Sequence, residues 1–219
     1  MTKNRDQYIR ALKYALLRPF YDPLLRWLLR EATFKTRLVE QARIGRGHRV
    51  LDLGCGTATL TLLIKRAHPE TEVVGLDGDV KVLEIAAAKA AKAGLDVKLD
   101  HGMAFSLPCP DAFFDRVLSS LLLHHLTTEN KLRTLAEVYR VLRPGGELHV
   151  ADWGKPDNQL MRMAFFPVQI LDGFKTTADN VGGLLPDLFR KVGFQKVQES
   201  TRYATVLGTL CLYSAVRPT

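Results

Sequence analysis

Cysteine is scarce in this chain of 219 residues, and its placement excludes several kinds of protein. The three cysteines, Cys55, Cys109 and Cys211, are odd in number and far apart in the sequence. They therefore predict neither a disulfide framework nor a C-x-x-C metal site. We expect a protein of the reducing cytoplasm that holds no metal.

Long apolar runs are also absent. No run approaches the roughly 20 residues that a membrane-spanning helix needs. The N-terminus, "MTKNRDQYIRALKYALL", lacks both a sustained apolar core and a small-residue cleavage site, so it does not predict a secretory signal. Hydrophobic residues make up 47% of the chain and charged residues 25%, which is typical of one globular domain with a real core.

Positive charge is concentrated at the N-terminus. Residues 1–49 hold 12 Lys and Arg against 4 Asp and Glu, whereas residues 50–219 hold 19 of each class. Apolar residues recur at helical spacing over 9–17 and 24–29, with Pro19 and Pro23 between them, which predicts two amphipathic helices. Such helices suit a peripheral contact with an anionic membrane surface, and a solvated basic face is the alternative.

From residue 49 the pattern changes to apolar strands that alternate with helices. The predicted strands are 49–53, 72–77, 96–102, 114–121 and 146–152, and the predicted helices between them are 59–68, 80–94 and 130–142. This alternation predicts a doubly wound α/β sheet with right-handed crossovers. Beyond residue 152 we expect helical pieces up to residue 180, a short helix at 185–194 and two strands within 195–218.

The stretch "VLDLGCGTATLTLL", residues 50–63, carries the first indication of function. Gly54 and Gly56 follow a buried strand, where a ligand of a doubly wound sheet binds. Asp52 in this turn would repel a pyrophosphate but suits a ligand with an ammonium group. Asp77 ends the next strand, where a carboxylate can accept hydrogen bonds from a ribose diol. Considered alone, the two glycines are also compatible with a plain turn between a strand and a helix. Considered alone, Asp77 is also compatible with a helix cap, although Asp79 is the better cap.

Four segments resemble a known family. "VLDLGCGTA", "VVGLD", "FDRVLSSLLLHHL" and "EVYRVLRPGGELHVAD" follow, in order and spacing, the motifs of class I methyltransferases that use S-adenosylmethionine. The chain looks most similar to the small-molecule branch with the quinone-biosynthesis and phospholipid enzymes. The resemblance implies a Rossmann-like, mostly parallel seven-stranded sheet with an antiparallel C-terminal strand. It also implies an N-terminal helical lid over 1–45 and a cofactor-binding domain over 46–219 with a helical insert at 155–180.

The resemblance also implies which residues hold the cofactor. The glycine turn would hold the methionine moiety and Asp77 the ribose. A tyrosine of the lid would reach the cofactor, with Tyr21 as the first candidate and Tyr14 as the second. Where the family carries an aspartate for the adenine amino group, this chain has Met103, and where it carries a third glycine this chain has Ala58. The expected cofactor residues are Asp52, Gly54, Cys55, Gly56, Asp77, Gly78, Met103, Ala104, Ser119 and Tyr21.

The expected chemistry is transfer of the cofactor's methyl group to a small, lipophilic acceptor by in-line displacement, with S-adenosylhomocysteine as product. In this family the exit of the fourth strand lies beside the methyl group, so His124 and His125 are the candidates there. We expect His124 to line the acceptor pocket, and a base is needed only if the acceptor loses a proton. A helix-capping or packing histidine is the alternative. No Asn-Pro-Pro-aromatic motif follows that strand, so we expect no nucleic acid partner. A non-catalytic cofactor-binding protein with a partner is the alternative function.

Overall fold

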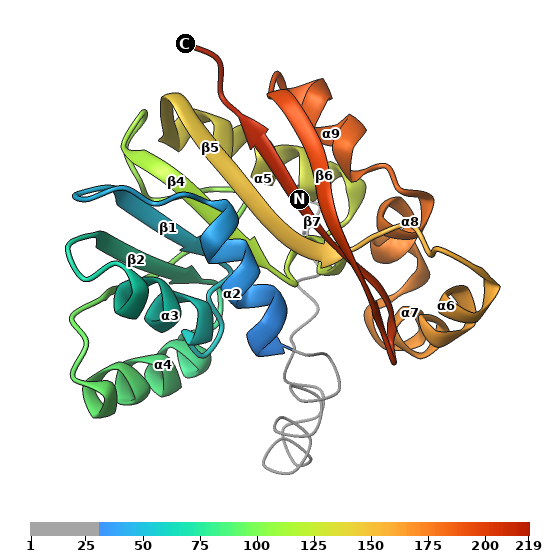
Figure 1. Ribbon diagram of the computed structural model, residues 1–219, viewed down its shortest axis with the longest axis horizontal. Coiled ribbons are helices and arrows are strands. Elements are labelled where there is room, and N and C mark those ends of the chain that lie inside the picture. The colour runs from blue at the N-terminus through green and yellow to red at the C-terminus, as the bar shows by residue number, and fades with distance from the viewer. Residues whose placement is uncertain (1–30) are drawn as a thin grey trace, which may run out of the picture.

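A twisted seven-stranded sheet runs through the centre of the molecule, with helices on both faces (Figure 1). The computed structural model describes residues 31–219. Residues 1–30, which include Tyr21 and most of the basic N-terminal segment, lie outside the described residues. The strands are β1 (Arg49–Leu53), β2 (Glu72–Asp77), β3 (Lys98–His101), β4 (Phe114–Ser120), β5 (Leu142–Trp153), β6 (Gln195–Thr205) and β7 (Gly208–Val216).

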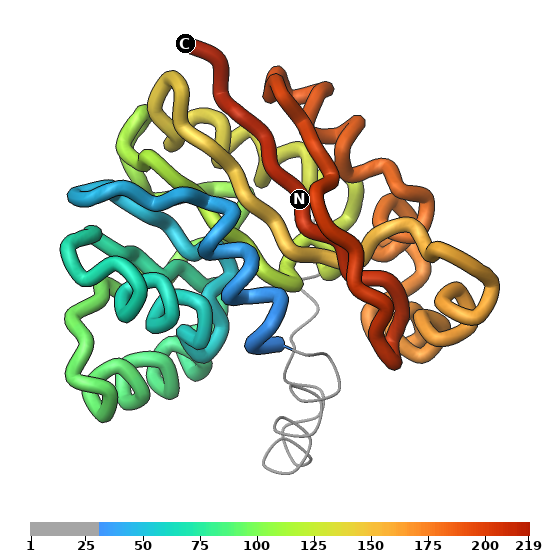
Figure 2. Tube along the Cα trace, viewed as in Figure 1, coloured from blue at the N-terminus to red at the C-terminus, as the bar shows by residue number. Residues whose placement is uncertain are grey.

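The strand order is β3-β2-β1-β4-β5-β7-β6. The pairs among β1 to β5 are parallel, and β7 is antiparallel to both of its neighbours. Figure 2 shows β6 and β7 as a long hairpin beside β5. The prediction of a mostly parallel, doubly wound sheet with an antiparallel strand near the C-terminus is confirmed. The order reverses between β1 and β4, which places a ligand-binding crevice at the carboxyl ends of these strands.

Helices cover the two faces of the sheet in separate groups. The described helices are α2 (Glu31–Gln41), α3 (Thr59–Ala67), α4 (Val80–Ala93), the 3-10 turn η2 (Leu123–His125), α5 (Thr128–Val141), α6 (Gln159–Ala164), α7 (Phe166–Asp172), α8 (Phe174–Gly182) and α9 (Leu185–Val192). Helices α2, α3 and α4 lie on one face, and α5 and α9 lie on the other (Figure 1).

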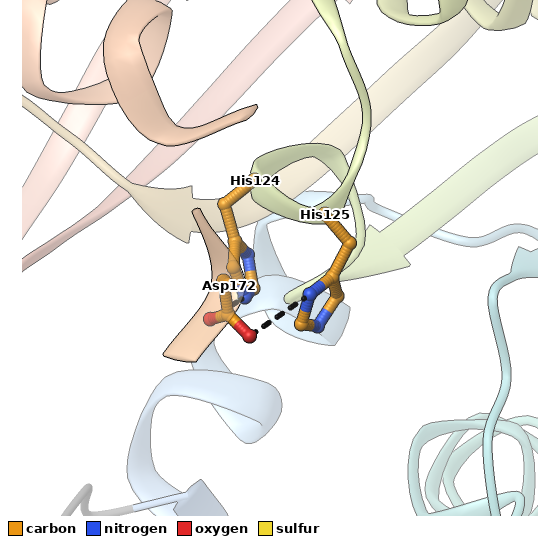
Figure 3. A group of neighbouring side chains, drawn as sticks. All are labelled: His124, His125 and Asp172. Atoms are coloured by element: carbon orange, nitrogen blue, oxygen red, sulfur yellow. Dashed lines mark ion pairs between the residues drawn. The ribbon is translucent and has the colours of Figure 1, made fainter. Parts of the chain in front are cut away.

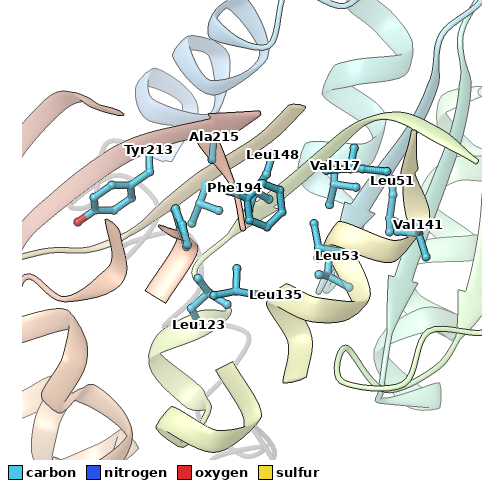
Figure 4. Close-up of a cluster of buried hydrophobic side chains, with 14 of the residues drawn as sticks. Leu51, Leu53, Val117, Leu123, Leu135, Val141, Leu148, Phe194, Tyr213 and Ala215 are labelled. Carbon is cyan, nitrogen blue, oxygen red and sulfur yellow. The ribbon is translucent and has the colours of Figure 1, made fainter. Parts of the chain in front are cut away.

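The alternating side chains of β1 show how the two cores form. Val50 packs among residues of α2 and α3, whereas Leu51 and Leu53 pack on the opposite face against Leu135 and Val141 (Figure 4). Both faces are buried because helices cover both, which is why the strand is a continuous apolar run in the sequence. Asp52 points to the same face as Val50 and is therefore buried beneath α3.

Local capping sets the ends of the helices. Asp79 caps α4, since its carboxylate accepts from the Lys81 N–H at 3.0 Å, and Gly94 ends that helix with φ +63°. Both predictions are confirmed. Helix α5 begins two residues earlier than predicted, because Thr127 caps it by accepting from the Asn130 N–H at 3.3 Å.

The chain from 155 to 182 forms three short helices, α6, α7 and α8, beside the end of the β6–β7 hairpin (Figure 1). Helix α6 contacts β7, and α8 contacts η2 and β5. These helices therefore lie next to the turn that carries His124 and His125. No helix within 31–219 is both long and apolar enough to cross a bilayer.

Candidate cofactor and acceptor site

A cavity opens at the carboxyl ends of β1, β2 and β3. It contains about 380 Å³ of space, part of it continuous with solvent. It is lined by Gly54, Leu76, Asp77, Gly78, Gly102, Met103, Ala104, Phe105, Leu122 and Leu126. Five of the residues predicted for the cofactor line it, namely Gly54, Asp77, Gly78, Met103 and Ala104. The strand-end reasoning thus predicted the place of this cavity.

The glycine turn wraps around the end of β2. The N–H groups of Gly54 and Cys55 both donate to the Leu76 carbonyl, at 2.8 and 3.0 Å. Gly54 and Gly56 have φ values of +72° and +54°, in the left-handed region that favours glycine. A methyl group on Gly54 would lie 2.9 Å from Leu122, so a side chain there would disturb the cavity wall. Ala58 also has a positive φ, +59°, where the family usually has its third glycine.

Asp77 connects the two neighbouring turns. Its Oδ2 accepts from the Gly56 N–H at 2.9 Å, and its Oδ1 accepts from the Asp79 N–H at 3.0 Å. Each carboxylate oxygen has a further lone pair for a ligand. Asp77 therefore holds the glycine turn in place and presents acceptors to the cavity. The N-cap of α4 is Asp79, so Asp77 does not serve as that cap.

Asp52 is buried beneath the glycine turn, with 1% of its surface exposed. Thr61 donates its hydroxyl to Oδ2 at 2.6 Å, and Oδ1 has no hydrogen-bond partner among the described residues. Burial raises the pKa of Asp52 from 3.8 to about 6, against the Thr61 hydrogen bond and the charge of Lys35, which lower it. An unsatisfied buried carboxylate oxygen is costly unless a donor reaches it. An ammonium group is a suitable donor, so this residue fits the predicted ligand.

Two predicted cofactor residues direct their side chains away from the cavity. Ser119 is buried and donates its hydroxyl to the Leu53 carbonyl at 2.9 Å, which ties β4 to β1. The Cys55 sulfur lies against Gly75 within the sheet, and burial raises the pKa of its thiol. Cys55 therefore offers only its backbone to a ligand.

His124 is anchored by an acid that the sequence analysis did not single out. Its Nδ1 lies 2.8 Å from Oδ1 of Asp152, the last acid of β5, and both residues are buried. Asp152 also accepts from the N–H groups of Leu123 and Trp153, both at 2.7 Å, and from the Asn180 amide at 3.2 Å. Burial raises the pKa of Asp152, but the charge and hydrogen bond of His124 outweigh it and the pKa is lowered. Because an ionised Asp152 only accepts, His124 carries its proton on Nδ1 and leaves Nε2 as an acceptor.

His125 and Asp172 complete this polar group. His125 Nδ1 lies 3.4 Å from Asp172 Oδ1, and His124 Nε2 lies 3.6 Å from Asp172 Oδ2 (Figure 3). Burial and the neighbouring His125 lower the pKa of His124, against the pull of the two acids. Burial also lowers the pKa of His125, but the hydrogen bond and charge of Asp172 outweigh it, so that pKa is raised. Leu122 and Leu126, on either side of the η2 turn, line the cavity, whereas neither histidine is among its lining residues.

Of the three acids and amides around His124, only Asp152 could have been found from its position in the sequence. Asp152 ends a buried strand adjacent to β4, and the strand-end argument used for Asp77 applies to it equally. Asp172 and Asn180 come from the 155–182 helices, where no periodicity points to them. Leu121, with φ +57°, turns the chain out of β4 so that the histidines face the insert, and a leucine does not indicate such a backbone.

The aromatic and methionine side chains at the end of β5 and in the insert divide into two sets. Trp153 and Phe165 are buried and pack against each other, with ring centroids 5.2 Å apart. Met163, Phe166 and Phe174 are exposed, and the last two pack together at 5.8 Å. The first set is core, and the second set forms part of the outer surface of the insert.

Comparisons with known proteins agree with this geometry. The family described as a methyltransferase domain matches residues 50–146. A demethylmenaquinone methyltransferase of Thermus thermophilus is 37% identical over 145 residues, which are 65% of this chain and 65% of that protein. A demethylmenaquinone methyltransferase of Listeria monocytogenes is 32% identical over 161 residues, 72% of this chain and 67% of the relative. The chain thus spans about two thirds of the length of these relatives.

A solved structure extends the similarity to nearly the whole chain. The S-adenosylmethionine-dependent methyltransferase SibL, in its apo form, superposes with a TM-score of 0.71 at 27% identity. The match covers 91% of this chain and 58% of that one. The match therefore also takes in regions outside residues 50–146.

Proposed function

We propose that this chain, which belongs to the class I S-adenosylmethionine-dependent methyltransferases, methylates a small lipophilic acceptor of the quinol type. S-adenosylmethionine is its cofactor. The observation that carries the acceptor class is the buried His124–Asp152 pair on the turn whose flanking residues, Leu122 and Leu126, line a largely apolar cavity. A quinol offers an apolar ring system with an acidic hydroxyl, and it needs one base. Relatives that methylate demethylmenaquinone, by their names, support the same class.

The residues present fit the cofactor. The unpartnered Asp52 Oδ1 would receive its ammonium group, and the Asp77 carboxylate would receive its ribose hydroxyls. Met103 and Ala104 would pack against its adenine. When bound, S-adenosylmethionine supplies a methyl group already activated on a sulfonium sulfur. The protein then has to align the acceptor with that methyl group and exclude water.

His124 would remove the proton from the acceptor hydroxyl. Its Nδ1 proton is held by Asp152, so its Nε2 lone pair is the one that can accept. The electron pair of the broken O–H bond would stay on oxygen and conjugate with the ring, so that a ring carbon would form the new bond to the methyl carbon while the pair of the methyl–sulfur bond stays on sulfur. The methylated ring carbon would then lose its own proton as the oxygen regains one, so that one proton leaves in total. Asp152 would stabilise the imidazolium formed on His124. His124 is thus the proposed catalytic residue, and Asp152 and Asn180 position it.

Methyl transfer with a labelled cofactor tests this proposal. The acceptor panel should contain a short-chain demethylnaphthoquinol, its oxidised quinone and phosphoethanolamine. We expect label in the quinol alone, and a His124→Gln variant with kcat lowered about 10²–10⁴-fold and S-adenosylhomocysteine affinity unchanged. Label in phosphoethanolamine instead of the quinol would overturn the acceptor class. Cofactor binding without transfer to any acceptor would favour the non-catalytic alternative.

We also propose peripheral contact with an anionic membrane, in keeping with a lipophilic acceptor. The proposal has two supports: the excess of Lys and Arg in residues 1–49 and a set of exposed apolar side chains on α6–α8. That set is Leu160, Met163, Phe166, Ile170, Leu171 and Phe174. Exposed Lys155 and Lys175 lie in the same part of the chain. The lid over 1–45 and the cofactor contact of Tyr21 remain predictions.

Vesicle sedimentation tests the membrane contact. We expect binding to vesicles that contain phosphatidylglycerol, weaker binding to phosphatidylcholine vesicles, and a loss of binding in a Phe166→Glu/Ile170→Glu variant. Equal binding of this variant and the parent chain would assign no role to the insert.

A further inference from the structure

Three potential metal ligands converge at the η2 turn. One ring nitrogen of His124, one of His125 and one carboxylate oxygen of Asp172 lie within 4.8 Å of one another. Figure 3 shows them meeting from the η2 turn and the end of α7. A tetrahedral Zn²⁺ site with bonds of about 2.0–2.1 Å places its ligand atoms roughly 3.3 Å apart. His124 Nε2 lies 3.6 Å from Asp172 Oδ2 and His125 Nδ1 lies 3.4 Å from Asp172 Oδ1, so each ring is separated from one carboxylate oxygen by close to that value.

The surroundings of His124 are those of a metal ligand. Metal-bound histidines generally donate their other ring N–H to a carboxylate or carbonyl, which fixes the ring and makes it a better ligand. His124 makes this bond to buried Asp152 at 2.8 Å, and Asp152 is itself held by two backbone N–H groups and by Asn180. Thus the ring is oriented with its Nε2 lone pair toward Asp172. His125 and Asp172 are less buried, so they can adjust around an ion.

We propose that His124, His125 and Asp172 bind one divalent transition-metal ion of the Zn²⁺ type. Two imidazole nitrogens and one carboxylate suit Zn²⁺ and its analogue Co²⁺ far better than Mg²⁺ or Ca²⁺, which prefer oxygen ligands. Three protein ligands leave at least one position open, as in metal sites that face a substrate pocket.

The site has a consequence for the proposed function, on which this part of the inference rests. His124 Nε2 has one lone pair, which cannot both bind an ion and accept the acceptor's proton. Bound Zn²⁺ therefore removes the base, and the metal inhibits methyl transfer. Asp172 makes the site possible because it faces both rings from the insert, opposite the η2 turn that carries them.

Titration of the full chain with Co²⁺ alone tests the site without cofactor or acceptor. We expect visible d–d absorption bands that saturate at one equivalent and disappear when Zn²⁺ displaces Co²⁺. His125→Asn and Asp172→Asn should each weaken Co²⁺ binding by at least about 100-fold, and Asp152→Asn by about 10–100-fold through the orientation of His124. His68→Gln, at the opposite end of the sheet, is the matched control and should bind Co²⁺ like the parent chain.

Co²⁺ binding tests the metal site, and the methyl-transfer assay tests the proposed function, so a failure of one can be told from a failure of the other. Absence of the bands, or bands that persist in both His125→Asn and Asp172→Asn, would overturn the metal site whatever the enzyme methylates. S-adenosylhomocysteine binding by each variant shows that it is folded. In the methyl-transfer assay Zn²⁺ should inhibit at the concentrations that displace Co²⁺. Faster transfer with Zn²⁺ would overturn the inhibitory consequence and the assignment of His124 as base, while the binding data would stand.

Discussion

The backbone N–H of Gly56 donates a 2.9 Å hydrogen bond to Oδ2 of Asp77, although 21 positions separate the two residues. This bond joins the turn after β1 to the end of β2, and the other Asp77 oxygen holds the N–H of Asp79. The carboxylate expected to bind the ribose therefore also shapes the turn expected to bind the methionine moiety. We therefore expect cofactor affinity and the geometry of the apo turn to be coupled through this side chain.

Replacement of Asp77 by alanine should reduce cofactor affinity and stability together. Hydrogen bonds to a charged acceptor contribute about 1.5–3 kcal/mol each, so we expect S-adenosylhomocysteine affinity to fall at least about 10-fold in calorimetry. The free energy of unfolding should fall by about 1–3 kcal/mol, since the Gly56 and Asp79 N–H groups lose their acceptor.

Asp79→Ala is the control for the Asp77 variant. It removes the N-cap of α4 and should cost about 1 kcal/mol of stability. Cofactor affinity should not change, because the Asp79 carboxylate bonds only to the Lys81 N–H in the described structure. Equal losses of affinity in the two variants would contradict the assignment of Asp77 to the ribose.

Alanine substitutions at two glycines distinguish the cost of backbone strain from an effect on cofactor binding. Gly56 and Gly47 have φ values of +54° and +69°, and an added methyl group meets no atom within 4 Å at either position. Alanine at either site should cost about 1–2 kcal/mol for the left-handed backbone. Only Gly56→Ala should also weaken S-adenosylhomocysteine binding, because its backbone lies in the turn that the cofactor approaches. Similar affinities of the two variants would place the cofactor away from Gly56.

The strands and the cofactor turn were predictable because local sequence determines them. A strand buried on both faces must be apolar throughout, and an acid or glycine directly after it lies at the ligand edge of the sheet. Local sequence does not predict the burial of Lys131. By its sequence it is an ordinary lysine in an amphipathic helix, yet it is fully buried because Asp179 approaches from α8. Such pairings depend on how the insert packs, which no local pattern records. The same holds for Asp172, which joins the two histidines from α7.

The buried pair of Lys131 and Asp179 should support the insert against the rest of the domain. Lys131 Nζ lies 2.9 Å from the Asp179 carboxylate and 2.6 Å from the Thr176 carbonyl, so it links α5 to α8. Lys131→Met leaves a buried, unpaired carboxylate, and we expect a loss of about 3–5 kcal/mol in urea unfolding. A Lys131→Met/Asp179→Leu double variant should recover much of this loss. A double variant no more stable than the single one would show that the lysine acts through packing alone.

Asp52 should make both stability and cofactor affinity depend on pH. In the cofactor-free fold, burial raises the pKa of Asp52 from 3.8 to about 6. Below pH 3.8 the carboxyl is protonated in the folded and the unfolded chain, and it has no effect on their balance. As the pH rises toward 6 the unfolded chain ionises first, so the free energy of unfolding falls. One pKa unit corresponds to about 1.4 kcal/mol, so the full loss is roughly 3 kcal/mol above pH 6.

Asp52→Asn removes this titration while keeping the shape of the side chain. Relative to the parent chain, its free energy of unfolding should rise by up to roughly 3 kcal/mol between pH 4 and pH 7. Asp96→Asn, at an exposed site, is the control for the loss of one carboxylate. Cofactor binding should respond in the opposite direction, because an ammonium group needs the ionised carboxylate. We therefore expect the parent chain's affinity for S-adenosylhomocysteine to increase from pH 5 to pH 7, and that of Asp52→Asn to be lower and flat. An affinity independent of pH in the parent chain would place the ammonium away from Asp52.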